Sequence, residues 1–339
     1  MSLPEARVLR PKTIDEAVRI LAEHGAQAMV LAGGTDVVPN LQMKLFSPRV
    51  LVDIKTIRSL RGITVEDSGT LRIGALTTLT EIARSPLIAA KYPVLSSAVK
   101  TIAGPLQRNM GTIGGNLCLE TRCHWYNQSY FWRKSLGGCL KKDGPICHVA
   151  PGGNICWAVW SGDSAPAFLT LDAEIEITSP RGPRRIHLND FYRNDGINRI
   201  ALGADELLTA VRVPPRSAGL RGVYHKLRLR NSIDYPLAGV AVAMELDAAG
   251  VCRSARVAIG AVNPAPLLVK QASEWLAGKQ YSPELVERVA HAAIQTGKPL
   301  TTSASTPVYR RDMLRLFTRR ALEQTWNSRN EFPISPAAD

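Results

Sequence analysis

The stretch "LAGGTDVVPN", residues 31–40, places a glycine turn at the end of the short apolar run "AMVL" at 28–31. A second glycine-rich loop, "MGTIGGN", occupies residues 110–116. Glycine lets backbone N–H groups approach a ligand closely and point at its oxygens, so either loop is suited to hold a diphosphate. Thr35 and Thr112 add hydroxyl donors to these loops. For each loop taken alone, a tight turn in an α/β fold is the alternative interpretation.

Neither loop carries the signature of a common nucleotide site. The dinucleotide fingerprint G-x-G-x-x-G fits neither loop, and neither has the G-K-[ST] ending of a P-loop. The sequence therefore disfavours a nicotinamide or ATP site.

Periodicity around the first loop predicts a small α/β unit. In "TIDEAVRILAEHG", residues 13–25, Thr13 and Glu16 are spaced as a capping box, and Gly25 is placed to end the helix. The runs 28–31 and 49–55 are predicted strands on either side of the loop. We therefore expect the first glycine turn to follow a buried strand.

In the rest of the chain, the pattern of predicted secondary structure changes at two places. From residue 62 we expect two short strands, a helix capped by Thr78 or Thr80, and later a hairpin within 172–188. Pro214-Pro215 is the candidate boundary, because three predicted strands follow it and then helices near 267–278, 283–296 and 307–325. Strands followed by helices predict an α+β domain.

Charge and composition limit the classes of protein to which this chain can belong. The 339 residues carry a formal net charge of +13, but Lys and Arg are spread along the chain without a nucleic-acid motif. We therefore expect an acidic protein partner or a solvated basic surface, and no nucleic acid. The charged N-terminus does not resemble a signal peptide, and no run is apolar enough to span a membrane, so the cytoplasm is the expected location.

Five of the six cysteines lie in one stretch, residues 118–156, which we call the cysteine segment. Cys123, Cys139, Cys147 and Cys156 are spaced C-x15-C-x7-C-x8-C, and Cys118 precedes them. Four thiolates suit a cubane iron–sulfur cluster, whereas zinc sites usually contain a close C-x2-4-C pair. Spacing alone leaves a cluster, a zinc site and unligated cysteines open.

Several motifs in a fixed order resemble the FAD-binding medium subunit of the molybdenum hydroxylases, which include the xanthine dehydrogenase and carbon monoxide dehydrogenase families. The resemblance runs from about residue 5 to residue 325. The stretches that carry it are "AGGTDVVPNLQMK", "LRIGALTTLTEIA", "TIGGN", "GDSAPAFLTLDAEIEI", "HKLRLRNSIDYPLAGVAVA" and "YRRDMLRLFTRRAL".

The resemblance implies an α+β fold. It consists of a vanillyl-alcohol-oxidase (PCMH)-type FAD-binding fold of two α/β subdomains, followed by a C-terminal α+β domain of the CO dehydrogenase flavoprotein type. The expected parts are subdomain 1 at 1–57, subdomain 2 at 58–215, an iron–sulfur insertion in it at about 118–157, the C-terminal domain at 216–326 and a tail at 327–339.

The resemblance also implies a set of FAD contacts. Two loops would wrap the diphosphate, Asp163 would lie near the ribityl chain or flavin edge, Thr78 in the central site, and Lys226 near the isoalloxazine. A solvated Lys226 on a basic strand is the alternative. The loop residues are Ala32, Gly33, Gly34, Thr35, Asp36, Thr112, Gly114, Gly115 and Asn116.

One branch of this family, the β subunits of 4-hydroxybenzoyl-CoA reductases, carries an insertion that resembles the cysteine segment and holds a 4Fe-4S cluster. In this sequence 46 residues separate Asn116 from Asp163, where other branches have a dozen or so. The resemblance places the cluster ligands at Cys123, Cys139, Cys147 and Cys156, leaves Cys118 as a buried thiol in an apolar strand, and leaves Cys252 as a packed strand residue.

Two sets of side chains in or next to the segment have expected roles beside such a cluster. Aromatic residues would shield it from water, and basic residues would steer an acidic ferredoxin, although a solvated loop would look the same. The aromatic set is Trp125, Tyr126, Tyr130, Phe131, Trp132, Trp157 and Trp160, and the basic set is Arg122, Arg133, Lys134, Lys141 and Lys142.

The resemblance therefore implies an electron-transfer subunit, with no catalytic residue on this chain. Electrons would pass from ferredoxin through 4Fe-4S and FAD to a small subunit with two 2Fe-2S clusters, and on to a large molybdopterin subunit that dehydroxylates 4-hydroxybenzoyl-CoA to benzoyl-CoA. The assembly would be a dimer of heterotrimers. The alternatives are the flavoprotein subunit of a molybdenum hydroxylase that oxidises an aldehyde or N-heterocycle, and a zinc-stabilised, non-enzymatic FAD-binding or assembly protein.

Overall fold

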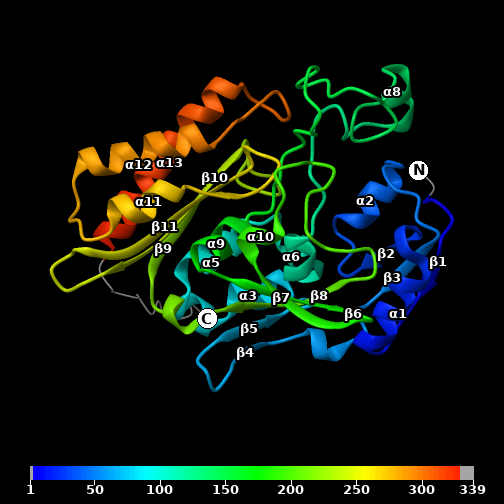
Figure 1. Cartoon of the computed structure of the whole chain (residues 1–339), viewed down its shortest axis with the longest axis horizontal. Coiled ribbons are helices and arrows are strands. Elements are labelled where there is room, and N and C mark those ends of the chain that lie inside the picture. The colour runs from blue at the N-terminus through cyan, green and yellow to red at the C-terminus, as the bar shows by residue number, and fades with distance from the viewer. Residues whose placement is uncertain (1–2, 329–339) are drawn as a thin grey trace.

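The computed structural model describes residues 3–328 and confirms the α+β class, with three sheets surrounded by helices (Figure 1). The strands are β1 (Arg7–Leu9), β2 (Ala28–Leu31), β3 (Val50–Asp53), β4 (Ile63–Val65), β5 (Leu71–Gly74), β6 (Glu174–Ser179), β7 (Gly182–His187), β8 (Leu207–Val213), β9 (Arg221–Leu227), β10 (Ala238–Leu246), β11 (Cys252–Gly260) and β12 (Leu267–Leu268). The helices are α1 (Ile14–His24), α2 (Val37–Gln42), α3 (Leu79–Arg84), α4 (Pro86–Lys91), α5 (Pro93–Lys100), α6 (Pro105–Met110), α7 (Ile113–Leu117), α8 (Tyr130–Ser135), α9 (Ser164–Thr170), α10 (Leu188–Phe191), α11 (Lys270–Leu276), α12 (Pro283–Thr296) and α13 (Pro307–Asn327).

The N-terminal sheet is parallel, in the order β1-β3-β2, and the first glycine turn leaves its strand β2. Thr13 caps α1 by accepting the Glu16 N–H, and Gly25 ends the helix with a φ of +49°, as predicted. The Glu16 carboxylate bonds the N–H of Lys12 instead of that of Thr13, so the capping box is shifted by one residue. The buried face of α1 packs on β3, which fixes the start of the loop that follows β2.

The second sheet is antiparallel, in the order β4-β5-β8-β6-β7. Burial alternates along β6 in the expected way: Ile175 and Ile177 are fully buried, and Glu176 between them is half-buried. The predicted hairpin is confirmed as β6 paired with β7. Thr78, of the two predicted candidates, caps α3, with Glu81 closing a capping box.

The third sheet, in the order β12-β11-β10-β9, is covered on both faces, so its central strand β10 is buried from Ala238 to Met244. The face with Val240 and Val242 meets α11, α12 and α13, while the face with Ala241 and Ala243 packs toward α5 and α9. Pro214 and Pro215 lie between β8 of the second sheet and β9 of the third. The third sheet therefore packs its alanine face on the same core as the second.

The cysteine segment contains α8 and otherwise irregular backbone, and it rises from the body near α2 (Figure 1). A small apolar core holds it, in which Cys123, Cys139 and Cys156 pack with Tyr126 and with Leu45 of the N-terminal unit. The expectation of a strand at Cys118 is wrong: this residue caps the C-terminus of α7, because Gly114 and Gly115 supply carbonyls to its N–H. Cys252 is buried at the start of β11, as predicted.

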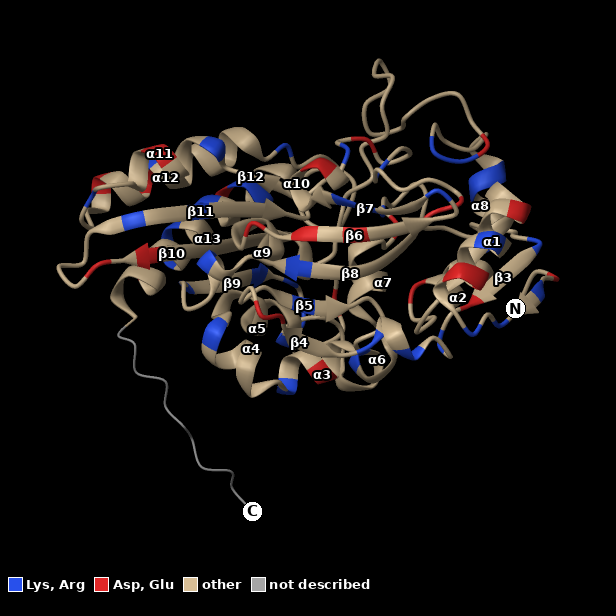
Figure 2. Ribbon diagram, turned by 60° about the horizontal axis from the view of Figure 1, so that its bottom comes forward, with Lys and Arg blue, Asp and Glu red and all other residues tan. Residues whose placement is uncertain are grey.

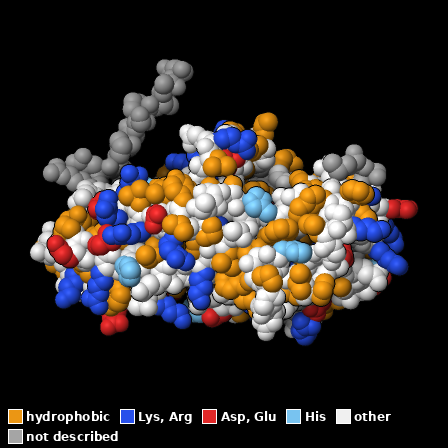
Figure 3. Space-filling view, turned by 90° about the horizontal axis from the view of Figure 1, so that it is seen from above, with side chains coloured by type: hydrophobic (Ala, Val, Ile, Leu, Met, Phe, Trp, Pro, Cys, Tyr) orange, Lys and Arg blue, Asp and Glu red, His pale blue; other side chains and the backbone are white. Residues whose placement is uncertain are grey.

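Two further expectations concern the surface and the end of the chain. No helix among residues 3–328 is both long and apolar enough to cross a membrane. On the face shown in Figure 3, Lys and Arg side chains form several separate groups. The predicted tail, 327–339, falls outside the described residues from position 329 onward.

Candidate functional site

A cavity of about 390 Å³, which we call the central cavity, lies where the two glycine loops meet the second sheet and the loop after β9. Part of its wall comes from α7, whose ribbon carries no charged residue (Figure 2), and part from Asp163, which directly precedes α9. Ten of the twelve predicted flavin contacts line it: Ala32, Gly33, Gly34, Thr35, Asp36, Thr112, Gly114, Gly115, Asn116 and Asp163.

The two glycine loops touch each other, although 76 residues separate Gly33 from Met110 in the sequence. A Cβ added at Gly33 would lie 1.8 Å from the Met110 carbonyl oxygen, and one at Gly111 would lie 3.4 Å from Thr35 Oγ1. Only glycine permits an approach this close between two backbones. The loops therefore form one continuous backbone surface along the cavity.

The Thr112 hydroxyl has a local role in the second loop. It accepts the Gly115 N–H at 3.2 Å and so caps α7, which leaves its own O–H free to donate. Thr78 does not reach the cavity wall: its hydroxyl bonds Glu81, and only its backbone pairs with Thr112. The structure thus gives Thr78 a capping role.

A buried charge pair stands behind one wall of the central cavity. Lys226 Nζ lies 2.9 Å from Asp163 Oδ2 and donates at 3.0 Å to the carbonyl oxygen of Thr101. The side chains of Lys226 and Asp163 are 1% and 4% exposed, so the alternative interpretation, a solvated Lys226, is wrong. Lys226 does not line the cavity itself and acts through Asp163.

Tyr224, on the same strand as Lys226, completes this group. Its hydroxyl donates to Asp163 Oδ1 at 2.7 Å, and a Cβ at Gly239 would lie 2.3 Å from that hydroxyl oxygen, so Gly239 makes room for the tyrosine. Burial raises the pKa of the Asp163 carboxyl, while Lys226 and the tyrosine hydroxyl oppose that rise. The carboxylate is thus fixed in position by two donors from β9.

Sequence reasoning missed Ser161. Its side chain lines the central cavity, and its buried hydroxyl has no hydrogen-bond partner in the protein. Buried polar atoms are normally paired, so this hydroxyl is available to a polar ligand. The glycine approach and the free hydroxyl together fit a cofactor that carries phosphate and hydroxyl groups. No signal in the sequence distinguishes this serine from others in the chain.

The four predicted cluster ligands, Cys123, Cys139, Cys147 and Cys156, all line one smaller cavity, which we call the cysteine cavity. None of them forms a disulfide, and each is buried. Burial in apolar surroundings raises the pKa of Cys123 to about 12 and that of Cys156 to about 11. Without a metal, these two thiols would stay protonated at neutral pH, and they become ligands only when a metal displaces the proton.

Within residues 3–328, no group of three or more His, Cys, Asp or Glu side chains is arranged to hold a single metal ion. A cubane cluster differs from a single ion because each of its four irons takes one thiolate. Four buried thiols around the cysteine cavity supply the number of ligands that such a cluster would need.

Only some members of the aromatic and basic sets lie beside the cysteine cavity. Trp125 and Tyr126 line the cysteine cavity, but Trp160 packs in the main core and Phe131 is 83% exposed, because α8 turns it outward. Among the basic residues, Arg133 and Lys141 point inward and bond to backbone carbonyls and Glu120. Several of the positively charged side chains in the segment are therefore held by contacts inside the protein and do not face the solvent.

Arg122 links the start of the cysteine segment to the first glycine loop. Its guanidinium forms an ion pair with Asp36 of the first glycine loop and donates to Asn127 at 2.7 Å, and its backbone pairs with Val159. Because Arg122 directly precedes Cys123, this pair fixes the start of the cysteine segment against the loop that lines the central cavity.

Comparison with known families identifies both parts of the chain. Residues 4–125 and 148–216 match the family described as FAD binding domain in molybdopterin dehydrogenase. Residues 223–325 match the family described as CO dehydrogenase flavoprotein C-terminal domain. The first match is interrupted at 126–147, within the cysteine segment.

Individual relatives agree with these matches. The chain is 33% identical over 279 residues to the nicotinate dehydrogenase FAD-subunit of Eubacterium barkeri, covering 82% of this chain and 81% of that protein. It is 30% identical over 316 residues to the carbon monoxide dehydrogenase medium chain of Hydrogenophaga pseudoflava, covering 93% and 95%.

The fold is also that of a solved relative. A chain in a structure of carbon monoxide dehydrogenase from Hydrogenophaga pseudoflava superposes with a TM-score of 0.79 at 29% identity, covering 96% of this chain and 99% of that one. The predicted fold, an FAD-binding domain followed by a CO dehydrogenase flavoprotein C-terminal domain, is confirmed.

Proposed function

Since the chain belongs to the FAD-binding medium subunits of the molybdenum hydroxylase family, we propose that it is the FAD and 4Fe-4S electron-transfer subunit of a 4-hydroxybenzoyl-CoA reductase. The observation that carries the proposal is the convergence of Cys123, Cys139, Cys147 and Cys156 on one buried cavity. Four thiols brought together from loops spread over 34 residues suit one thiolate for each iron of a cubane.

FAD, when bound, exchanges electrons in pairs or singly, and so connects donors and acceptors of both kinds. The residues of this chain that would hold it are the two glycine loops, Asn116, Ser161 and Asp163 along the central cavity. Lys226 and Tyr224 would keep the Asp163 carboxylate oriented toward the cofactor. The chain thus binds and orients a redox group without supplying an acid, base or nucleophile.

The cysteine segment would serve as the entry point for electrons. Trp125 lines the cysteine cavity, and its ring centroid lies 5.9 Å from that of Trp132, which is partly exposed on α8. Lys134, next to these aromatic residues, is exposed. This surface fits a small acidic electron donor of the ferredoxin class.

The remaining steps belong to partner subunits. We propose a small subunit with 2Fe-2S clusters and a large molybdopterin subunit, assembled as a dimer of heterotrimers. On the large subunit, two electrons and two protons would remove the phenolic hydroxyl of 4-hydroxybenzoyl-CoA as water and leave benzoyl-CoA. The second candidate is a molybdenum hydroxylase that oxidises an aldehyde or N-heterocycle, which the similarity to a nicotinate dehydrogenase subunit favours.

Two measurements test these proposals. Chemical analysis of anaerobically purified protein should find about four irons and four acid-labile sulfides per chain. Zinc without sulfide would instead support the zinc-stabilised alternative. The full complex, supplied with reduced viologen, should convert 4-hydroxybenzoyl-CoA to benzoyl-CoA. No turnover of that thioester, together with rapid oxidation of nicotinate or an aldehyde, would favour the hydroxylase.

A further inference from the structure

We infer that Lys141 is a positioning residue that raises the reduction potential of the cluster by placing a fixed positive charge beside it. This inference rests on the proposed function, because it requires a cluster at the four cysteines. The same side chain ties the middle of the cysteine segment to Glu120 and Thr121 at its start and to the loop at Gly196. Neither the family resemblance nor the cysteine spacing assigns Lys141 such a role.

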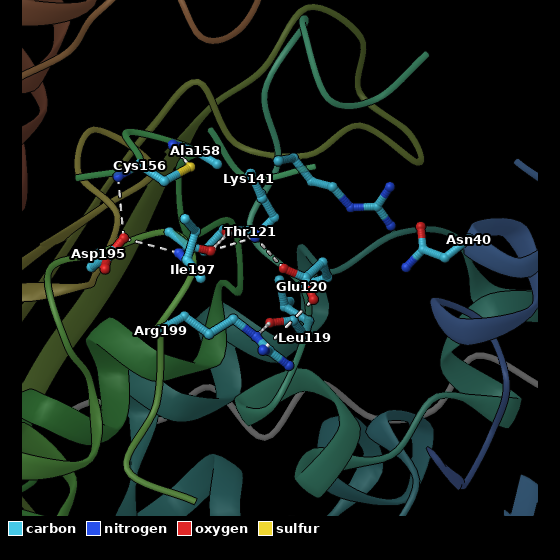
Figure 4. A network of polar contacts seen from close by, with 12 residues as sticks. Asn40, Leu119, Glu120, Thr121, Lys141, Cys156, Ala158, Asp195, Ile197 and Arg199 are labelled. Carbon is cyan, nitrogen blue, oxygen red and sulfur yellow. Dashed lines mark hydrogen bonds and ion pairs between the residues drawn. The ribbon is translucent and has the colours of Figure 1, made fainter. Parts of the chain in front are cut away.

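Lys141 is buried and all its donors are used. Its side chain is 6% exposed, and Nζ donates to Glu120 Oε1, to Thr121 Oγ1 at 2.7 Å and to the Gly196 carbonyl oxygen. An ammonium has three N–H donors, so this set is complete. Figure 4 shows the Lys141 side chain reaching toward Glu120 and Thr121 at the start of the cysteine segment. A lysine held in this way stays at one position relative to the cysteines.

The position is next to the cysteines. Lys141 lines the cysteine cavity together with all four of them, and its Nζ lies 5.0 Å from the ring centroid of Tyr126. Gly196, which accepts from Lys141, also donates its N–H to the Cys156 carbonyl oxygen at 2.8 Å. A Cβ at Gly196 would lie 2.8 Å from Cys156 Sγ, so this loop packs directly on the sulfur.

The negative charge of Glu120 is shared between Lys141 and a second cation. Its side chain is 9% exposed and also faces Arg199, whose Nη1 lies 3.6 Å from Glu120 Oε2. Two cations, Lys141 and Arg199, thus face one carboxylate, and of these three side chains only Lys141 lines the cysteine cavity. Asp195 accepts the Cys156 N–H at 3.2 Å and opposes the charge of Lys141, but it does not line the cysteine cavity.

The physical consequence concerns one-electron reduction. A cluster with four thiolates is anionic, and accepting one electron makes it more negative by one unit. A buried cation stabilises that reduced state more than the oxidised one, because the low local dielectric strengthens the attraction. Lys141 should therefore make the cluster a better acceptor from its donor.

The test is an EPR-monitored redox titration of the whole protein, with iron content measured in parallel. Lys141→Met should lower the midpoint potential, so that the ratio of reduced to oxidised cluster at a fixed ambient potential falls about tenfold. That change corresponds to about 59 mV for a one-electron couple. The matched control is Lys142→Met, which removes a neighbouring half-buried charge paired with Asp143 and should shift the ratio by less than about twofold.

Two further variants separate charge from packing. Glu120→Gln should raise the potential, and the double variant Glu120→Gln/Lys141→Met should return it toward the wild-type value, because one charge of each sign is removed. A purely structural role predicts no such restoration. Equal potentials in wild type, Lys141→Met and Glu120→Gln would overturn the inference while leaving the cluster in place. Wild-type protein without iron and sulfide would overturn the proposed function as well.

Discussion

The central cavity and the cysteine cavity are built from different parts of the chain. Around the central cavity, backbone of two glycine loops comes into direct contact, as at Gly33 and Met110. Around the cysteine cavity, four side chains meet from a segment with little regular structure, held by Arg122 and Lys141. The first cavity is therefore sensitive to added atoms on the backbone, and the second to the loss of a donor atom or a charge.

Gly33→Ala should have the largest effect, because its Cβ would lie 1.8 Å from the Met110 carbonyl oxygen and force the two loops apart. We expect bound FAD to fall below about a tenth of the wild-type amount, since backbone displacement of this size removes the close approach that glycine permits. The measurement is the flavin-to-protein ratio after gel filtration.

Gly152→Ala is the matched control, since a Cβ there meets nothing within 4 Å. It should keep its flavin. Full flavin in Gly33→Ala would show that contact between the loops is not required for binding.

Cys156→Ser should affect the cysteine cavity and leave the central cavity intact. Loss of one of four thiolates should remove most of the iron, because a hydroxyl is a poor substitute for a cluster thiolate. Flavin should remain near the wild-type level. Iron analysis and flavin absorbance on the same sample make the measurement, and Cys252→Ser, which changes a buried thiol in β11, should retain its iron. Unchanged iron in the Cys156 variant would remove this residue from the ligand set.

Tyr224→Phe should show that one wall of the central cavity also depends on a side chain. The change removes the 2.7 Å hydrogen bond to Asp163 and should lower the free energy of unfolding by about 1–2 kcal/mol. Urea unfolding followed by circular dichroism measures it. Tyr309→Phe, at an exposed tyrosine of α13, should change it by less than about 0.5 kcal/mol. Equal stability of the two variants would mean that the Asp163 hydrogen bond contributes nothing.

The smallest expected effect is the loss of stability when acid protonates Glu206 and breaks its ion pair with Arg184. Glu206 lines the central cavity, and its hydrogen bonds to Arg184, at 2.7 and 2.8 Å, hold its pKa below the ordinary value. A carboxyl with a lowered folded-state pKa stabilises the protein above its unfolded pKa and loses that contribution as the pH falls through the folded value.

The free energy of unfolding should therefore drop by less than about 1 kcal/mol from this pair below about pH 4.3. Arg184→Gln should flatten this part of the pH profile, measured by urea unfolding at a series of pH values. A profile with the same slope in both proteins would contradict the assignment.

Much of the fold could be predicted because it depends on local pattern. Thr13, Gly25 and the 3.6-residue periodicity predict α1, and the alternation of Ile175 and Ile177 predicts β6. The strand expected at Cys118 was wrong because the glycines before it supply helical carbonyls, which apolar pattern does not indicate.

For the candidate site, the sequence predicted well which loop residues line the central cavity and predicted poorly which charged side chains are buried. Ten predicted residues lie along the central cavity, because glycine-rich loops are a local signal that a family resemblance locates well. Exposure was left open for Lys226 and predicted poorly for Lys141 and Phe131, because a residue's type does not show whether its side chain faces the interior or the solvent.

The sequence alone determined the glycine loops, the four spaced cysteines and the order of the elements, because each is a property of neighbouring residues. Only the tertiary structure decided that Gly33 meets Met110, that Asp163 meets Lys226, and that Lys141 meets Glu120 beside Cys156. These contacts join residues distant in the chain, and their partners are chosen by how the three sheets pack. That packing is a global balance of buried area and paired charge, which no short stretch of sequence contains.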